Sequence, residues 1–263
     1  MAEAETVTYR GNCHCGDFVF ETKLPELKSA FYCNCSICAK KGYLWLFPGD
    51  DNVKIVKGSL EGLTAYTFGP KKLKHLAHAI QGLACWDLEN IQYDGAALGE
   101  PFEPPVHKGE VPEAGDGEVV YTGSCHCGAV TVAAATKPLD EASENAIECN
   151  CSSCERIASI WIYSPKSSVV LSGDEANIGK YGFNNHLIDK TFCKTCGVGL
   201  TNVFKVMSEE QVAAMPERTR DVYAVKHMYT GVNARTLHGV DLAKLKTKKV
   251  DGLNRIPGDY VNP

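Results

Sequence analysis

Residues 123–128 read Gly-Ser-Cys-His-Cys-Gly, and residues 11–16 read Gly-Asn-Cys-His-Cys-Gly. A second motif is also present twice, because residues 33–38 read Cys-Asn-Cys-Ser-Ile-Cys and residues 149–154 read Cys-Asn-Cys-Ser-Ser-Cys. The two copies lie 112 residues apart for the first motif and 116 for the second. Two motifs repeated in the same order, with four more residues between them in the second copy, indicate that one structural unit occurs twice in the chain.

The correspondence between the two halves is interrupted by one long gap. Tyr66 and Tyr181 lie 115 residues apart, whereas Asp94 and Asp251 lie 157 apart. The first half therefore lacks the counterpart of 42 residues, roughly 192–233, and this stretch contains the motif Cys-Lys-Thr-Cys at 193–196. We expect a degenerate first domain over residues 7–95 and a complete second domain over residues 119–256.

The segment between the two domains, residues 96–118, contains four Pro, four Gly and six acidic residues with a single Lys. This composition is typical of an extended linker. The whole chain carries 27 Lys and Arg against 32 Asp and Glu, a net charge of −5, which excludes a globally basic nucleic-acid-binding protein. No apolar run approaches 18 residues, and the acidic start is unlike a secretory leader. We expect a cytoplasmic protein, or alternatively a nuclear one, without a membrane or nucleic-acid partner; the sequence does not define its oligomeric state.

The apolar segments are short and bounded by Gly, Pro or Ser, which is typical of β-strands. The clearest are residues 44–47, 53–56, 160–163 and 168–171. Signals for helices are few. Ser208 and Gln211 have the spacing of a capping box, and Pro216 should end that helix near Met215. We therefore expect a mainly β fold with small helices.

The chain has 13 cysteines, an odd number, so they cannot all pair as disulfides within it. Their spacing favours metal binding instead. In the second half, the pairs Cys125/Cys127 and Cys193/Cys196 could together supply four thiolates to a tetrahedral zinc ion. Such a site has no open position, so it should be structural and part of folding.

The remaining cysteines of the second half, Cys149, Cys151 and Cys154, supply three sulfurs within six residues. Three protein ligands with one open position are typical of catalytic zinc, so we take these cysteines as the candidate catalytic residues. Two alternatives stay open: a closed site completed by a His or Asp ligand, and a set of buried thiols without metal.

The first half repeats the three-sulfur motif at Cys33, Cys35 and Cys38, whereas Cys13 and Cys15 have lost their partner pair. Two thiolates do not make a stable structural site. All five remain in the candidate metal set, so we expect two zinc ions in the second domain and allow for one in the first.

Other residues near the motifs have weaker signals. Cys85 lies in an apolar stretch and is expected to be a buried or free thiol. His14 and His126 stand between paired cysteines and should point away from a metal. Four aromatic residues follow the three-Cys motifs and should pack in the core or line a pocket; these are Trp45, Phe47, Trp161 and Tyr163. Four charged residues next to the motifs should be solvated or contact a substrate carboxylate; these are Lys40, Lys41, Glu155 and Arg156.

Three ordered motifs now define a resemblance. Cys-His-Cys-Gly, then Cys-Asn-Cys-Ser-x-Cys, then Phe-Cys-Lys-Thr-Cys-Gly at 192–197 resemble the glutathione-dependent formaldehyde-activating enzyme and centromere protein V (CENP-V/GFA) family. The resemblance covers most of residues 121–252 with seven cysteines and about residues 9–95 with five. It implies an Mss4-like β-sheet fold in two tandem copies, the first truncated, a structural four-Cys zinc and an active-site three-Cys zinc.

The resemblance also implies an activity. It suggests a zinc-dependent carbon–sulfur lyase of the S-(hydroxymethyl)glutathione synthase type, in which the thiol of glutathione adds to formaldehyde or a similar thiol adduct is cleaved. Zinc would deprotonate a thiol at the open position, although three thiolates weaken its Lewis acidity. Glutathione or a related thiol adduct is thus the expected partner. The alternatives are a non-catalytic zinc-binding interaction module similar to centromere protein V, and thiol redox chemistry at Cys193 and Cys196.

Overall fold

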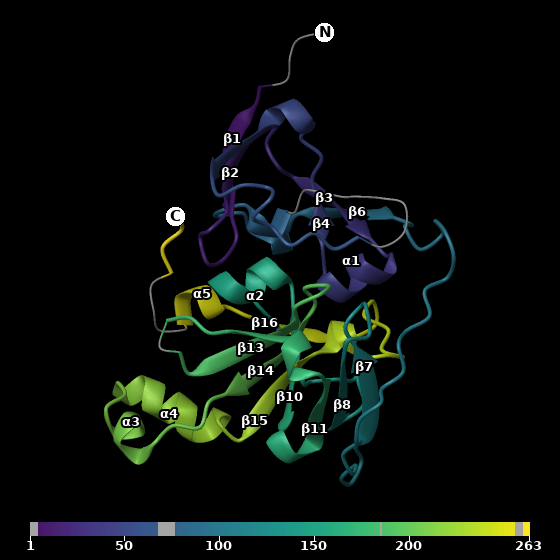
Figure 1. Cartoon of the computed structure of the whole chain (residues 1–263), viewed down its shortest axis with the longest axis vertical. Helices are drawn as coiled ribbons and strands as arrows, with labels where there is room; N and C mark the ends of the chain where they lie inside the picture. Colours follow the sequence, from purple (N-terminus) through teal and green to yellow (C-terminus); the bar gives the residue numbers. More distant parts are fainter. Residues whose placement is uncertain (1–4, 68–76, 185, 256–259) are drawn as a thin grey trace. The chain divides into compact units, whose positions relative to one another are not determined.

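The computed structural model describes residues 5–67, 77–184, 186–255 and 260–263 (Figure 1). The chain divides into two compact units. Unit 1 contains Met1–Phe102, Ser152–Ala158 and Tyr260–Pro263, and unit 2 contains Glu103–Cys151 and Ser159–Asp259. The described residues are mainly β, with four sheets and few helices, as the sequence predicts.

Unit 1 contains two small sheets of three strands each. The first is antiparallel, in the order β1 (Val7–Asn12), β2 (Val19–Leu24) and β5 (Val53–Lys57). The second has the order β4 (Leu44–Trp45), β3 (Ser29–Cys33) and β6 (Glu89–Tyr93), and β3 pairs with β6 in parallel. The short helix α1 (Ser36–Lys41) follows β3, and three 3-10 helices, at Asp50–Asn52, Ala77–Ala79 and Cys85–Asp87, complete the elements among residues 5–67 and 77–102.

The core of unit 1 contains residues of β2, β3 and β4 and of the 3-10 helices at Ala77–Ala79 and Cys85–Asp87. Leu24, Ala30, Leu44 and Ile80 are buried there together with Cys85. The prediction that Cys85 is a buried thiol is therefore confirmed, and burial raises its pKa to about 12. Such a thiol is protonated at neutral pH and packs as a small apolar side chain.

Unit 2 also has an antiparallel sheet of three strands, in the order β11 (Val169–Gly173), β8 (Val130–Thr136) and β7 (Val119–Ser124). All seven residues of β8 are buried. This burial explains why β8 consists of a continuous run of Val, Thr and Ala rather than an alternating pattern, because both faces of this central strand are covered.

The large sheet of unit 2 has seven strands in the order β12-β13-β14-β15-β10-β9-β16. Their bounds are β12 (Ile178–Tyr181), β13 (Ile188–Cys193), β14 (Gly199–Phe204), β15 (Tyr229–Asn233), β10 (Ile160–Pro165), β9 (Ala146–Cys149) and β16 (Thr247–Val250). The pairing of β9 with β16 is parallel, and the other neighbours are antiparallel. The main core lies between the two sheets and includes Val132, Ile160, Ile162 and Val232.

The helices are short, and only one was predicted. Ser208 caps α3 (Glu209–Ala213) through the expected capping box with Gln211. Pro216 then precedes α4 (Glu217–Lys226) as its N-cap, and no pattern in the sequence predicts this helix. The other helices are α2 (Ser152–Ile157) and α5 (Gly252–Arg255), with 3-10 turns at Lys166–Ser168, Glu175–Asn177 and Ala234–Thr236. None of the described helices has both the length and the apolar composition that a membrane span requires.

Candidate metal centres

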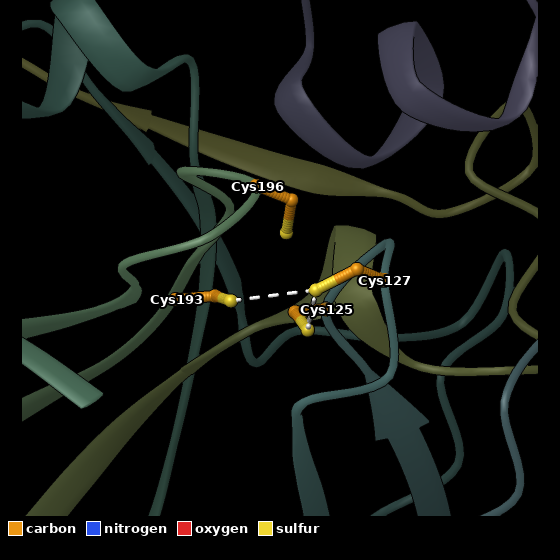
Figure 2. Close-up of side chains that lie close together, drawn as sticks. All are labelled: Cys125, Cys127, Cys193 and Cys196. Carbon is orange, nitrogen blue, oxygen red and sulfur yellow. Dashed lines mark hydrogen bonds between the residues drawn. The ribbon is translucent and has the colours of Figure 1, made fainter. Parts of the chain in front are cut away.

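Two tight turns of unit 2 bring four sulfurs together. Cys125 and Cys127 lie between β7 and β8, and Cys193 and Cys196 lie where β13 turns into β14 (Figure 2). Each turn is closed by a backbone hydrogen bond to its first cysteine, from Cys125 N to Val130 O (2.8 Å) and from Cys193 N to Val198 O (3.0 Å). A glycine with positive φ follows each pair, Gly128 at 79° and Gly197 at 69°, a conformation that other residues rarely adopt.

The geometry of this cluster fits zinc. The four Sγ atoms all lie within 4.8 Å of one another, and the Sγ of Cys127 is 3.6 Å from those of Cys125 and Cys193. In a tetrahedral site with Zn–S bonds of about 2.3 Å, sulfurs are about 3.8 Å apart. Cys125, Cys193 and Cys196 are buried, while Cys127 is exposed. These four thiols are therefore close enough to one another to hold a single metal ion.

The thiols of this cluster differ in acidity. The pKa of Cys196 is lowered to about 4, chiefly because Cys125 donates a hydrogen bond to its sulfur. The same hydrogen bond holds the proton of Cys125 and raises its pKa. The cluster thus keeps a thiolate at neutral pH, the form in which cysteine binds metals.

The second cluster lies in the six-residue segment 149–154. The Sγ atoms of Cys149, Cys151 and Cys154 lie within 4.8 Å of one another. Cys149 ends β9, and its sulfur accepts a hydrogen bond from the backbone N–H of Cys151 (3.4 Å). Cys151 and Cys154 are buried. These three thiols could hold zinc, and among the described residues no fourth His, Cys, Asp or Glu joins the group.

Asn150, between the first two cysteines, fixes this segment. Its side chain donates a hydrogen bond to Asp251 Oδ1 (3.1 Å) and accepts one from the backbone N–H of Leu253 (3.0 Å). Asn150 and Asp251 are not among the site residues predicted from the cysteine motifs. A signal was nevertheless present, because both halves of the chain keep an Asn in the motif and an Asp-Gly further on.

Unit 1 contains the same arrangement on a smaller sheet. Cys33, Cys35 and Cys38 have their sulfurs within 4.8 Å of one another, and the indole Nε1 of Trp45 donates a hydrogen bond to Cys38 Sγ (3.2 Å). A hydrogen bond from Cys38 lowers the pKa of Cys35 to about 5. Asn34 Nδ2 donates to Asp94 Oδ1 (2.8 Å), as Asn150 does to Asp251. This cluster could also hold a metal ion.

Cys13 and Cys15 lie in the turn between β1 and β2 with their sulfurs 3.2 Å apart. Among the described residues they join no group of three or more potential ligands, so a four-sulfur site like that at Cys125 is not formed there. His14, between them, stacks on Tyr260 with ring centroids 4.3 Å apart, and its Nε2 is 3.0 Å from Ser152 Oγ. The described residues of the first half thus include the pair Cys13/Cys15 but no second pair of cysteines that corresponds to Cys193/Cys196.

Some of the residues that flank the two three-Cys motifs lie in the core and others lie at the surface. Trp45 and Trp161 are buried, as expected for core residues, whereas Phe47 is 58% exposed. Arg156 donates from Nε to the backbone oxygen of Asn12 (3.2 Å) within unit 1. Burial raises the pKa of Glu155. His126 is buried and, like His14, is absent from the three groups of potential ligands among the described residues.

Comparison with known proteins finds a matching family model and a similar solved structure. Residues 120–230 match the family model for glutathione-dependent formaldehyde-activating enzyme, a range that contains all seven cysteines of the second half. Among solved structures, the chain is similar to a Rhodobacter sphaeroides protein at 23% identity, over 48% of this chain and 99% of that one, with a TM-score of 0.35.

Proposed function

Since residues 120–230 match the family model for glutathione-dependent formaldehyde-activating enzyme, we propose that this chain is a zinc-dependent carbon–sulfur lyase. Its reaction forms or cleaves S-hydroxymethylglutathione-like thiol adducts, and glutathione or a related thiol is its partner. The observation that carries the proposal is the presence of two unlike sulfur clusters, one of four thiols and one of three. A four-sulfur site is closed, whereas a three-sulfur site has room for a substrate.

Cys149, Cys151 and Cys154 are the residues that would hold the catalytic zinc. When bound there, zinc supplies a Lewis acid at which a thiol loses its proton at neutral pH. The protein positions the three sulfurs through the Cys151 N–H and through the Asn150–Asp251 hydrogen bond. Outer hydrogen bonds of this kind orient metal ligands and tune the metal.

Cys125, Cys127, Cys193 and Cys196 would hold a structural zinc. Their ion would tie the β7–β8 turn to the β13–β14 turn, which is 66 residues further along the chain. Because the unfolded chain does not preform such a site, the free energy of metal binding contributes directly to folding.

We further propose that the two halves are tandem copies of one Mss4-like domain, over residues 7–95 and 119–256, joined by residues 96–118. Two observations support the proposal. β3 pairs in parallel with β6 in unit 1, as β9 does with β16 in unit 2. An isolated bridge joins Gly11 to Ile80, and another joins Gly123 to Leu237, at corresponding places in the aligned sequence. We also propose that the protein is cytoplasmic or, alternatively, nuclear.

The test of catalysis uses the full-length, zinc-loaded protein. The wild-type chain should form S-hydroxymethylglutathione from formaldehyde and glutathione faster than the spontaneous reaction, as followed by NMR. Cys151→Ser should lose most of that excess rate and one zinc ion, while the four-sulfur zinc is kept. The matched control is Cys35→Ser, which alters the corresponding cysteine of unit 1 and should leave the rate unchanged.

A wild-type protein that carries its zinc but never exceeds the spontaneous rate would exclude the lyase. That result would favour the non-catalytic zinc module. Equal losses of rate in C151S and C35S would instead show that both three-sulfur clusters contribute to turnover.

A further inference from the structure

Cys13 and Cys15 form a pair of neighbouring thiols outside the proposed zinc sites. Their sulfurs are 3.2 Å apart, and Cys15 is exposed while Cys13 is half-buried. The corresponding pair of unit 2 faces Cys193 and Cys196, but the described part of unit 1 supplies no such second pair. Cys13 and Cys15 are therefore close enough to form a disulfide and lack the ligand set that would bind a metal in the four-sulfur manner.

Backbone hydrogen bonds fix the turn that carries these two thiols. Gly16 N donates to Cys13 O (3.0 Å), and Cys13 N donates to Phe18 O (3.0 Å). The backbone N–H of Phe18 also donates to Cys13 Sγ (3.3 Å). A donor aimed at sulfur stabilises the thiolate, which is the nucleophilic form of cysteine. The turn thus favours Cys13 as the attacking sulfur and leaves Cys15 as its exposed neighbour.

Two cationic side chains lie at the ends of the turn. Lys57 Nζ donates to the backbone oxygen of Gly16 (2.7 Å), and Arg156 Nε donates to that of Asn12 (3.2 Å). One carboxylate, Asp17, accepts a hydrogen bond from the Cys15 thiol and holds its proton in place, so Cys15 is the weaker nucleophile of the pair. Positive charge beside a reactive thiol attracts small anions and speeds their encounter with it. The turn therefore suits a disulfide whose two halves are anionic low-molecular-weight thiols.

We propose that Cys13 and Cys15 exchange thiol for disulfide with disulfides of anionic low-molecular-weight thiols, an activity separate from the proposed lyase. The Cys13 thiolate attacks one sulfur of the small disulfide, so that a mixed disulfide forms and the first small thiolate leaves. The Cys15 thiolate then attacks the Cys13 sulfur, the internal disulfide forms and the second small thiolate leaves. The protein loses two electrons and two protons, and the small disulfide gains them as two thiols.

The test uses full-length, zinc-loaded protein and glutathione disulfide as the probe. After incubation and alkylation, mass spectrometry should find Cys13 and Cys15 joined as a disulfide, while Cys125 and Cys127, in the same motif of unit 2, stay reduced. Cys15→Ser should accumulate glutathione as a mixed disulfide on Cys13. Cys13→Ser should accumulate at least about tenfold less adduct on Cys15 in the same time, because the thiolate-stabilising N–H is at Cys13.

A charge variant tests the role of Lys57 without altering either thiol. Lys57→Gln should slow exchange several-fold at low ionic strength, and the difference should shrink as salt is added. Lys54→Gln, on the same exposed strand β5, is the matched control and should exchange at the wild-type rate.

Two results would overturn the proposal. One is an unmodified Cys13 and Cys15 after exposure to glutathione disulfide. The other is a zinc ion in unit 1 that is lost in both Cys13→Ser and Cys15→Ser but retained in Cys35→Ser, since the pair would then be a metal site.

Discussion

At the scale of single residues, the three-sulfur clusters depend on polar neighbours as well as on their cysteines. Asn150 connects the cysteine segment to Asp251 and Leu253, and Asn34 connects the corresponding segment to Asp94. Neither Asn touches a sulfur in these bonds. Their effect is to fix the backbone that carries the sulfurs, which is how outer residues influence metal affinity.

Replacing Asn150 by Ala tests this role. The variant loses both hydrogen bonds to the α5 region, so the sulfurs are less well positioned and zinc affinity at Cys149, Cys151 and Cys154 should fall by about 10- to 100-fold. Competition with a chromophoric chelator measures the change. Asn34→Ala serves as the control and should leave the affinity of this site intact, whereas wild-type affinity in N150A would show that the segment holds its shape without the Asn.

Close packing explains the glycine that opens both cysteine motifs. A Cβ on Gly123 would lie 2.5 Å from the backbone oxygen of Thr236, a distance that real structures do not contain. The strand β7 therefore approaches the 3-10 turn at Ala234–Thr236 closely, and Gly123 bridges to Leu237 there. The glycine is needed for this contact and not for metal binding.

At the scale of elements, the β13–β14 hairpin is the part that completes the four-sulfur cluster. Its turn carries two of the four cysteines, and the sulfurs reach those of the β7–β8 turn (Figure 2). The hairpin stabilises unit 2 through strand pairing with β12 and β15, and a zinc ion at the four-sulfur cluster would add to this stabilisation.

Cys196→Ser tests this contribution. Loss of one ligand should release the structural zinc and lower the free energy of unfolding of unit 2 by more than about 4 kcal/mol, as loss of a metal site commonly does. Thermal unfolding and zinc content measure the effect. Cys85→Ser, which alters a buried thiol of unit 1, should leave the zinc content unchanged.

The same cysteine gives unit 2 a pH dependence. The pKa of Cys196 is lowered in the folded protein from an ordinary value of 9.0 to about 4. A lowered pKa stabilises the folded state fully above the ordinary value, and this contribution declines as the pH falls from about 9 to about 4. Stability of the wild type should therefore decrease toward acid pH more steeply than that of C196S; parallel curves would contradict this assignment.

Elements and sites whose residues lie close together in the chain could be predicted from the sequence, whereas those that depend on distant residues could not. The capping box identified α3 because Ser208 and Gln211 are three residues apart, and local spacing is visible in a sequence. Helix α4 was not predicted, because only Thr219 and Tyr223 of its ten residues are buried and no apolar period marks it. The cysteine clusters were predictable from spacing. The Asn150–Asp251 bond was not, because its partners are 101 residues apart in the chain.

At the scale of the whole chain, the three groups of sulfurs should differ in how firmly they hold metal. The four-sulfur group has three buried members, and its two turns are closed by backbone hydrogen bonds. Each three-sulfur group lies in a single short segment of six residues. An open site exchanges its ion more readily because the fourth position admits a competing ligand.

Stepwise chelation of the full-length protein tests this order. A mild chelator should remove zinc from the three-sulfur groups first, with the far-UV circular dichroism spectrum unchanged. A stronger chelator should then remove the last ion and unfold unit 2, because that ion is coupled to folding. Zinc counted by atomic emission beside each spectrum gives the result, and simultaneous loss of all ions with unfolding would refute the distinction.

The parallel pairing of β9 with β16 has a consequence for synthesis on the ribosome. The segment with Cys149 and Cys151 emerges about 100 residues before Asp251 and the strand that pairs with β9. At a translation rate of about 5–20 residues per second, roughly 5–20 s pass between the synthesis of the cysteine segment and that of strand β16. Its thiols are therefore exposed to the surrounding solution during translation, and the zinc ion proposed for this site would bind only late in the synthesis of the chain.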